Sequence, residues 1–164
     1  MLIGVLSDTH NQRQRTETAV RLLQAEGAEA LFHCGDLTDP DIVSLCSVLP
    51  CYFVLGNNDL GSADRIQMAI DQSENAICLG WGGQVELAGK RIAITHGHLF
   101  REYQRLRATD PDYLFSGHTH LASDQLDGTT RGINPGALHR ASQYTVVIGN
   151  LIDGQFRLLQ VARS

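Results

Sequence analysis

The first half of the chain alternates short apolar runs with stretches of helical periodicity. Continuous apolar runs predict strands buried on both faces at residues 2–6, 30–33 and 51–55. Apolar positions at helical spacing, with a cap or stop residue beside them, predict helices at 14–26, from Asp39-Pro40 onwards, and at 63–72. This β-α-β-α-β order predicts parallel strands joined by right-handed crossovers.

In the second half, the apolar runs come in pairs around turn sequences. Three hairpins are predicted, at 84–87 with 91–95, at 122–126 with 129–133, and at 143–151 with 155–161. A helix at 100–107 and a strand at 113–116 lie between the first two hairpins. Because hairpins are antiparallel, we expect an α/β fold in which two mixed β-sheets pack as a sandwich flanked by helices. No linker or repeat interrupts the pattern, so a single domain over 1–164 is expected.

Composition and charge exclude several classes of protein. Of the 164 residues, 43% are hydrophobic and 19% charged, which is ordinary for a globular chain rather than a disordered one. The formal net charge of −5 argues against a surface that binds nucleic acid. The apolar runs are too short for a membrane helix, and the first is followed at once by Asp8 and His10, unlike a signal peptide. We therefore expect a cytoplasmic protein without membrane contact, with its four cysteines reduced and mostly buried.

Histidines, acids and asparagines gather just after predicted strands. Five motifs follow strands in this way: SDTH (7–10), CGD (34–36), GNND (56–59), THGH (95–98) and GHTH (117–120). The carboxyl edge of an α/β sheet is where connecting loops converge on a ligand. The five motifs are therefore expected to meet at one site.

The spacing within these motifs favours metal binding. Asp8 and His10 are two residues apart, as are His118 and His120, and in extended backbone such pairs point to the same side. Carboxylate, imidazole and amide donors suit Mn²⁺, Fe²⁺, Zn²⁺ or Ni²⁺ better than a cysteine-rich structural zinc site would. There are more candidate ligands than one ion needs, so we expect two ions that share a bridging carboxylate.

Taken in order, these motifs resemble those of the calcineurin-like metallophosphoesterases. D-x-H, G-D, G-N-x-D, G-H and G-H-x-H all occur, and Asn134-Pro135-Gly136 also resembles the small single-domain phosphodiesterase branch from bacteria and archaea. The resemblance implies a four-layer α/β/β/α fold. It further implies two divalent ions, with manganese as the first choice and nickel, iron, zinc or magnesium as alternatives.

The family pattern assigns a role to each matching residue. The first ion would be held by Asp8, His10 and His120, and the second by Asn57, His96 and His118, with Asp36 bridging the two. His96 is preferred to His98 as a ligand because it lies at the predicted strand end. A hydroxide held between two such ions would attack phosphorus in line with the leaving oxygen. The expected activity is hydrolysis of a small phosphodiester or related phosphoester.

Asn58 departs from the family pattern. The wider family has a histidine directly after the ligand asparagine, where it acts as a general acid or stabilises the transition state. An amide cannot deliver a proton at neutral pH. Asn58 and His98 are therefore the candidate catalytic side chains outside the ligand set, and diesters with acidic leaving groups should be better substrates than simple monoesters.

Other polar residues near the motifs keep two interpretations. Asp59 is equally suited to support the site or to cap the next helix, whereas His33 fits a buried core position better than a ligand. His139 and Arg140 follow the Asn-Pro-Gly turn and are expected near the mouth of the site, either facing a phosphate or exposed. Trp81 is expected to cover a sheet edge rather than to line a cleft.

The main alternative function is a protein-interaction scaffold on the same fold. The eukaryotic retromer subunit resembles this family and sets that precedent, and Asn58 favours it, although no ligand position is missing here. A nuclease is disfavoured because the chain lacks a basic face. A homo-oligomer formed through an exposed hairpin edge stays open.

Overall fold

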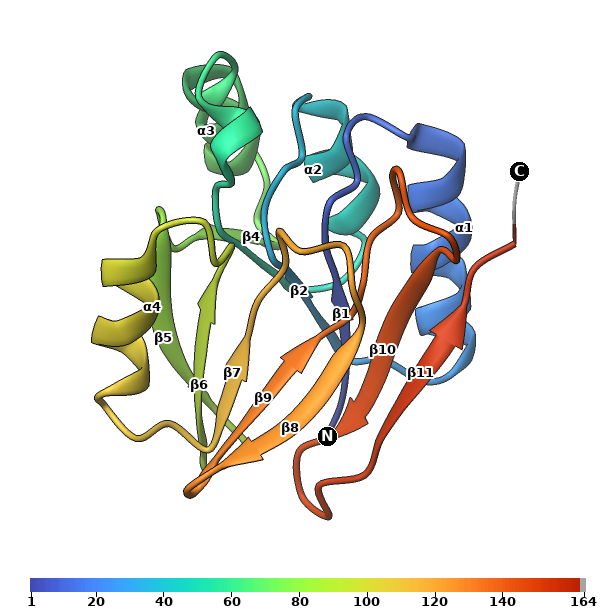
Figure 1. The fold of residues 1–164 in the computed structure, drawn as a ribbon. Coiled ribbons are helices and arrows are strands. Elements are labelled where there is room, and N and C mark those ends of the chain that lie inside the picture. The colour runs from blue at the N-terminus through green and yellow to red at the C-terminus, as the bar shows by residue number, and fades with distance from the viewer. Residues whose placement is uncertain (163–164) are drawn as a thin grey trace.

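The computed structural model describes residues 1–162, which form two β-sheets stacked face to face with helices on the outside (Figure 1). The first sheet has the strand order β11-β10-β1-β2-β3-β4. Its strands are β1 (Leu2–Leu6), β2 (Ala30–His33), β3 (Cys51–Phe53), β4 (Ala76–Cys78), β10 (Thr145–Asn150) and β11 (Phe156–Gln160). Strands β1 to β4 are parallel, as the β-α-β order predicts, whereas β10 and β11 are antiparallel to their neighbours.

The second sheet has the order β5-β6-β7-β9-β8. Its strands are β5 (Gly82–Leu87), β6 (Lys90–Thr95), β7 (Tyr113–Phe115), β8 (Ser123–Asp127) and β9 (Thr130–Asn134). The three predicted hairpins are confirmed as β5–β6, β8–β9 and β10–β11. The pairings β6–β7 and β7–β9 are parallel, so these three strands end at the same edge of the sheet.

The helices cover the outer faces of the sandwich. The first sheet is covered by α1 (Arg13–Ala25), α2 (Asp41–Cys46) and α3 (Ala63–Asp71), and α4 (Phe100–Arg107) packs on the second (Figure 1). The four-layer α/β/β/α arrangement is thereby confirmed. Gly27 ends α1 as predicted, with a φ of 89° that favours glycine.

The core divides according to the two faces of each buried strand. Ile3 and Val5 of β1 pack toward the second sheet, and Phe32 of β2 meets Phe115 of β7 edge-on with 5.1 Å between ring centroids. Leu6 at the end of β1 packs instead under the helices, so both faces of the strand are buried. This double burial explains why the apolar run at 2–6 is continuous rather than alternating.

Two local features differ from the sequence prediction. The second helix begins at Asp41 rather than at Asp39-Pro40; Asp39 lies ahead of it, where its carboxylate accepts the backbone N–H of Asp41 at 2.9 Å. The edge strand β4 was not predicted, because its three residues are too few to give a periodic pattern. Cys34, Cys46 and Cys51 are buried and Cys78 is half-buried, all as free thiols, as expected.

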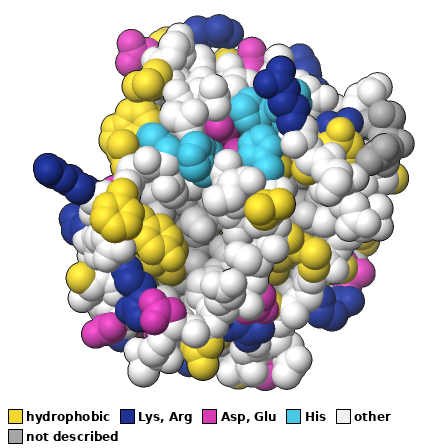
Figure 2. Space-filling view, in the orientation of Figure 1, with side chains coloured by type: hydrophobic (Ala, Val, Ile, Leu, Met, Phe, Trp, Pro, Cys, Tyr) yellow, Lys and Arg dark blue, Asp and Glu magenta, His cyan; other side chains and the backbone are white. Residues whose placement is uncertain are grey.

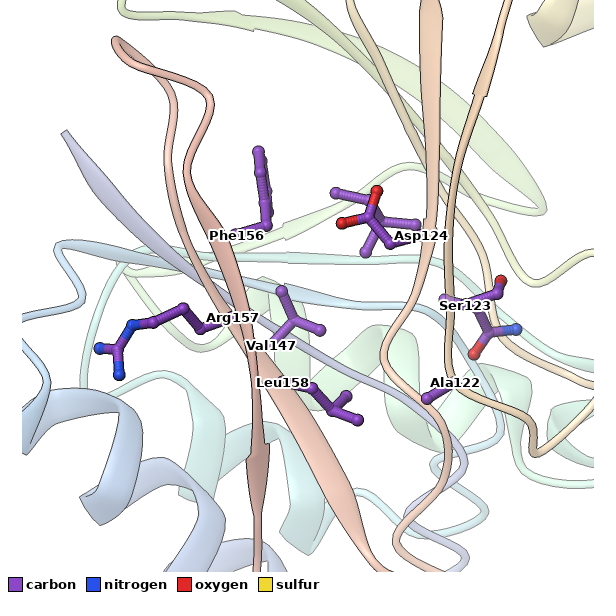
Figure 3. A pocket seen from close by; sticks show the side chains of 9 residues that line it. Ala122, Ser123, Asp124, Val147, Phe156, Arg157 and Leu158 are labelled. Carbon is purple, nitrogen blue, oxygen red and sulfur yellow. The ribbon is translucent and has the colours of Figure 1, made fainter.

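The sandwich is open along one side, between β8 of the second sheet and the β10–β11 hairpin of the first. Figure 3 shows this opening, with Phe156 and Leu158 on one wall and Ala122 and Asp124 on the other. The cavity has a volume of about 190 Å³. Within residues 1–162, no helix is long and apolar enough to cross a membrane.

Candidate metal centre

Six loops converge at one edge of the sandwich, at the top in Figure 1. They follow the parallel strands β1, β2, β3, β6, β7 and β9, and their histidines gather on one face of the molecule (Figure 2). A cavity of about 310 Å³ opens there, lined by His10, Asp36, Asn57, Asn58, His118, His120, His139 and Arg140. The structure thus brings five motifs, spread over more than one hundred residues, to one place.

Asp8 is held by one oxygen and leaves the other unpaired. Its Oδ2 accepts the Ser7 hydroxyl at 2.6 Å and the backbone N–H of His118 at 3.0 Å. Its Oδ1 is buried without a hydrogen-bond donor. This Oδ1 lies close to the Nε2 atoms of three imidazoles, at 3.1 Å from His120 and at 4.0 Å from both His10 and His96.

The carboxylate of Asp36 lies between two of these imidazoles. Its Oδ2 is 3.4 Å from Nε2 of His10 and 3.4 Å from Nε2 of His96. Asn58 supports it from the other side, donating its backbone N–H to Oδ1 at 2.9 Å and its side-chain amide to Oδ2 at 2.7 Å. Burial alone would raise the pKa of Asp36, but the two imidazoles and Asn58 hold it well below its usual range.

Backbone carbonyls orient two of these imidazoles. Nδ1 of His96 donates to the carbonyl of Cys34 at 2.7 Å, and Nδ1 of His120 lies 3.4 Å from the carbonyl of Arg140. A hydrogen bond at Nδ1 fixes the tautomer whose Nε2 lone pair faces the centre, which is how metal-ligating histidines are commonly held. Burial would lower the pKa of His96, but Asp36 and Asp8 raise it instead.

Buried polar atoms without partners concentrate at this centre. Among the described residues, six buried side-chain nitrogen or oxygen atoms lack a hydrogen bond, and five of them belong to the motifs: Asp8 Oδ1, His10 Nε2, Asn57 Oδ1, His96 Nε2 and His98 Nδ1. Such groups are costly to bury unless something satisfies them. Two overlapping sets could each hold a metal ion, namely Asp8 with His10 and His120, and Asp8 with Asp36 and His96. The residues therefore fit a pair of divalent cations.

The backbone at the site adopts a conformation that the sequence did not indicate. Asp8, His10, His118 and His120 have φ values of 53°, 42°, 69° and 59°. The prediction that these pairs lie in extended backbone is therefore wrong, although each pair does aim at one centre. Eight of the ten non-glycine residues with positive φ lie in the converging loops: Asp8, His10, Asn11, Asp36, Thr38, His118, His120 and Arg140. Strain of this kind, of order 1 kcal/mol per residue, typically accumulates at functional sites.

Asp59 supports the site rather than merely capping a helix. It is fully buried, and its carboxylate accepts the backbone N–H groups of Gly56, Asp36 and Thr38 at 2.7, 2.9 and 2.6 Å. Burial raises the pKa of Asp59 against the effect of these donors. The three bonds tie the loop that carries Asp36 to the loop that carries Asn57.

His33 is a buried core residue, as predicted. Its Nε2 lies 3.0 Å from the hydroxyl of Thr9, and its Nδ1 accepts the backbone N–H of Gly35 at 3.2 Å. Burial, reinforced by the nearby His96, lowers the pKa of His33 to about 3, so the ring is neutral at physiological pH. His33 thus connects the loops of Asp8 and Asp36 without facing the centre.

His98 and Trp81 lie together on one side of the ligand cluster. The His98 ring is 5.3 Å from that of His96 and meets Trp81 edge-on at 5.7 Å. Trp81 therefore contacts the site, although it was expected only to cover a sheet edge. Leu99 and Phe100, the next residues along the chain, are 41% and 71% exposed.

His139 and Arg140 lie on the other side, on the loop that follows β9. The His139 ring is 4.6 Å from that of His10, and burial with the nearby His10 and Arg140 lowers its pKa. Both residues line the cavity, as expected for a position near its mouth, and the parallel pairing of β9 with β7 brings their loop there.

Comparison with known proteins agrees with this geometry. A sequence model of the calcineurin-like phosphoesterase superfamily domain matches residues 1–154. A protein of Methanothermobacter thermautotrophicus named "probable metallophosphoesterase" is 32% identical over 73% of this chain and 67% of its own length. The phosphodiesterase YfcE of Escherichia coli is 27% identical over 84% of this chain and 79% of its own.

Solved structures share the fold. An archaeal phosphodiesterase superimposes with a TM-score of 0.87 at 25% identity, covering 98% of this chain and all of the other. A mutant form of Vps29 from Entamoeba histolytica superimposes over the whole length of both chains with a TM-score of 0.66. Its identity is 17%, so it shows the fold alone.

Proposed function

Because the chain belongs to the calcineurin-like phosphoesterase superfamily, we propose that it is a metal-dependent phosphodiesterase that hydrolyses a small phosphodiester or related phosphoester. The observation that carries the proposal is the set of five buried side-chain nitrogen and oxygen atoms that have no hydrogen-bond partner where the loops meet. A pair of cations would satisfy these atoms, and turnover then separates a phosphodiesterase from a scaffold that also binds metal. The catalytic unit is proposed to be one domain comprising the whole chain.

The proposed ligand sets are those that the family pattern assigns. One ion would be held by Asp8, His10 and His120, and the other by Asn57, His96 and His118, with Asp36 shared between them. The ring of His118 lies 5.1 Å from that of His96, which places it beside the second set. When bound, two divalent ions supply an acidified water and a positive field for the phosphoryl oxygens, with manganese as the first candidate.

The side chains of this protein contribute positioning and charge. The ligand set includes only two carboxylates, so the centre carries net positive charge once two divalent ions are bound and suits a phosphate group. Asn58 holds both oxygens of Asp36 and is therefore assigned as a positioning residue rather than a proton donor. His98 is half-exposed, and burial together with His96 lowers its pKa. It is proposed to orient the leaving group.

The test is hydrolysis of bis-p-nitrophenyl phosphate by metal-stripped protein, to which Mn²⁺, Ni²⁺, Zn²⁺ or Mg²⁺ is returned singly. Asp36→Asn should abolish turnover, whereas Asp71→Asn, an exposed carboxylate on α3, should leave it within twofold of the wild type. p-Nitrophenyl phosphate should be turned over more slowly than the diester. Equal activity of Asp36→Asn and wild type would show that the hydrolysis arises elsewhere.

The second candidate is a protein-interaction scaffold, which Asn58 favours because it replaces the family's histidine. This function predicts stoichiometric metal binding without turnover of any phosphoester. The same assay therefore separates the two functions.

A further inference from the structure

Arg140 is the cationic side chain of the metal cavity. Of the residues that line this cavity, it alone is a lysine or an arginine. Most basic side chains of the described region form ion pairs with carboxylates, but none is formed by Arg15, Arg101 or Arg140. Arg140 thus presents an uncompensated charge at the mouth of the proposed active site.

The backbone places Arg140 at the rim and not over the centre. Its carbonyl lies 3.4 Å from Nδ1 of His120, the ring nitrogen on the far side from the Nε2 that faces Asp8. The His139 ring lies 4.6 Å from that of His10, so the residue before Arg140 borders the first proposed ligand set. Arg140 itself is exposed and lines the cavity, so its guanidinium is accessible to an anion that enters there.

The loop is built to hold Arg140 in this position. Its φ of 45° is in the left-handed region, which it shares with five of the proposed ligands. Behind it, Arg15 donates to the carbonyl of Leu138 at 2.6 Å and lies 3.6 Å over the ring of Tyr144. This anchor fixes the loop from α1 and adds a second positive charge on the same side.

We propose that Arg140 is a specificity residue that binds a second anionic group of the substrate. The natural substrate would then be a phosphodiester in which the alcohol group that stays bonded to phosphorus carries a phosphate or a carboxylate. The inference rests on the proposed phosphodiesterase function and names the substrate class for that site. A guanidinium binds such oxyanions through two parallel hydrogen bonds.

The test uses two substrates that differ only in a remote phosphate. These are the p-nitrophenyl ester of thymidine 5′-phosphate and the same ester carrying an additional 3′-phosphate. Charge-assisted hydrogen bonds at a solvent-exposed rim support a preference of about tenfold in kcat/KM for the doubly anionic ester. Arg140→Gln should reduce this ratio to between about one and two. Arg140→Lys keeps the charge but loses the two parallel N–H donors, so its ratio should lie between those of Arg140→Gln and the wild type.

Arg101→Gln is the matched control. Arg101 is also unpaired and exposed, but it lies on α4 outside the cavity, so its variant should keep the wild-type ratio. The proposal is overturned if wild type shows no preference, if Arg140→Gln retains the preference, or if Arg101→Gln loses it equally.

Binding gives a readout that does not depend on turnover. Calorimetry of manganese-supplemented protein should show thymidine 3′,5′-bisphosphate binding about tenfold more tightly than thymidine 5′-phosphate, and Arg140→Gln should remove the difference. If no ester is hydrolysed, the proposed function fails, and this ratio still decides the role of Arg140. Equal affinities in the wild type would refute the anion site.

Discussion

His33 should make the protein sensitive to mild acid in a way that one substitution removes. The folded state keeps this ring neutral, with a pKa of about 3, because burial, reinforced by the nearby His96, disfavours the protonated form. In the unfolded chain the ring is free to take a proton near its ordinary pKa of 6.5. The depressed pKa of the folded state therefore makes unfolding progressively easier as the pH falls from 6.5 toward 3.

The magnitude follows from the size of the pKa shift. One proton bound only by the unfolded state changes the free energy of unfolding by about 1.36 kcal/mol per pH unit. Between pH 6.5 and pH 4.5, His33 should thus cost the folded state about 2–3 kcal/mol, a large share of a typical total of about 5–15 kcal/mol. In His33→Gln, which carries no titrating ring, this contribution should disappear.

The assay is urea denaturation of metal-free protein at a series of pH values between 7 and 4.5. His33→Gln is expected to be less stable than wild type at pH 7 and to lose about 2–3 kcal/mol less on acidification. Leu23→Ala, which truncates a buried apolar residue of α1, controls for instability itself and should show the wild-type pH dependence. If the wild type and His33→Gln lose stability in parallel, His33 is not neutral in the folded state and the reasoning is refuted.

Three further substitutions test how the site is held. Asp59→Ala should lower the free energy of unfolding in urea by about 3 kcal/mol, since three buried backbone N–H groups lose their acceptor, whereas exposed Asp71→Ala should change it little; a loss below 1 kcal/mol would contradict this. In Gly56→Ala the new Cβ would overlap the Asp36 carboxylate, so calorimetry should show manganese affinity reduced at least tenfold. Gly61→Ala, where the Cβ is in open space, should keep the wild-type affinity, and equal affinities of the two variants would refute the overlap. Asn58→His adds a group that can deliver a proton, so the rate of hydrolysis across a series of aryl phosphodiesters should depend less steeply on the pKa of the leaving group. An unchanged slope of rate against leaving-group pKa would argue against a missing general acid.

The sheets could be predicted because their strands are buried on both faces. Leu2–Leu6 and Ala30–His33 are continuous apolar runs for the physical reason that helices cover one side and the second sheet the other. The edge strand Ala76–Cys78 has no such constraint and left no pattern. Hairpin turns likewise indicated local pairing, but nothing local indicated that Thr130–Asn134 also pairs in parallel with Tyr113–Phe115.

The site was predicted as a set of residues but not as a geometry. Motif order placed Asp8, Asp36 and His96 at neighbouring strand ends, and the structure brings them within a few ångströms of one another. The left-handed backbone at Asp8 could not be read from the chain, because it depends on hydrogen bonds to loops far away in sequence, such as that from His118. The same dependence hid the role of Asp59, whose three donors come from two separate loops.

The most direct test of the two-ion proposal is a titration of metal-stripped protein with Mn²⁺ in which bound metal and the rate of bis-p-nitrophenyl phosphate hydrolysis are measured on the same samples. We predict that wild type binds two ions per chain and that the rate rises mainly with the second equivalent. Asp36→Asn, which lacks the shared carboxylate, should bind fewer ions and stay inactive. A rate that is already maximal at one equivalent, or hydrolysis that does not depend on bound manganese, would contradict the two-ion centre.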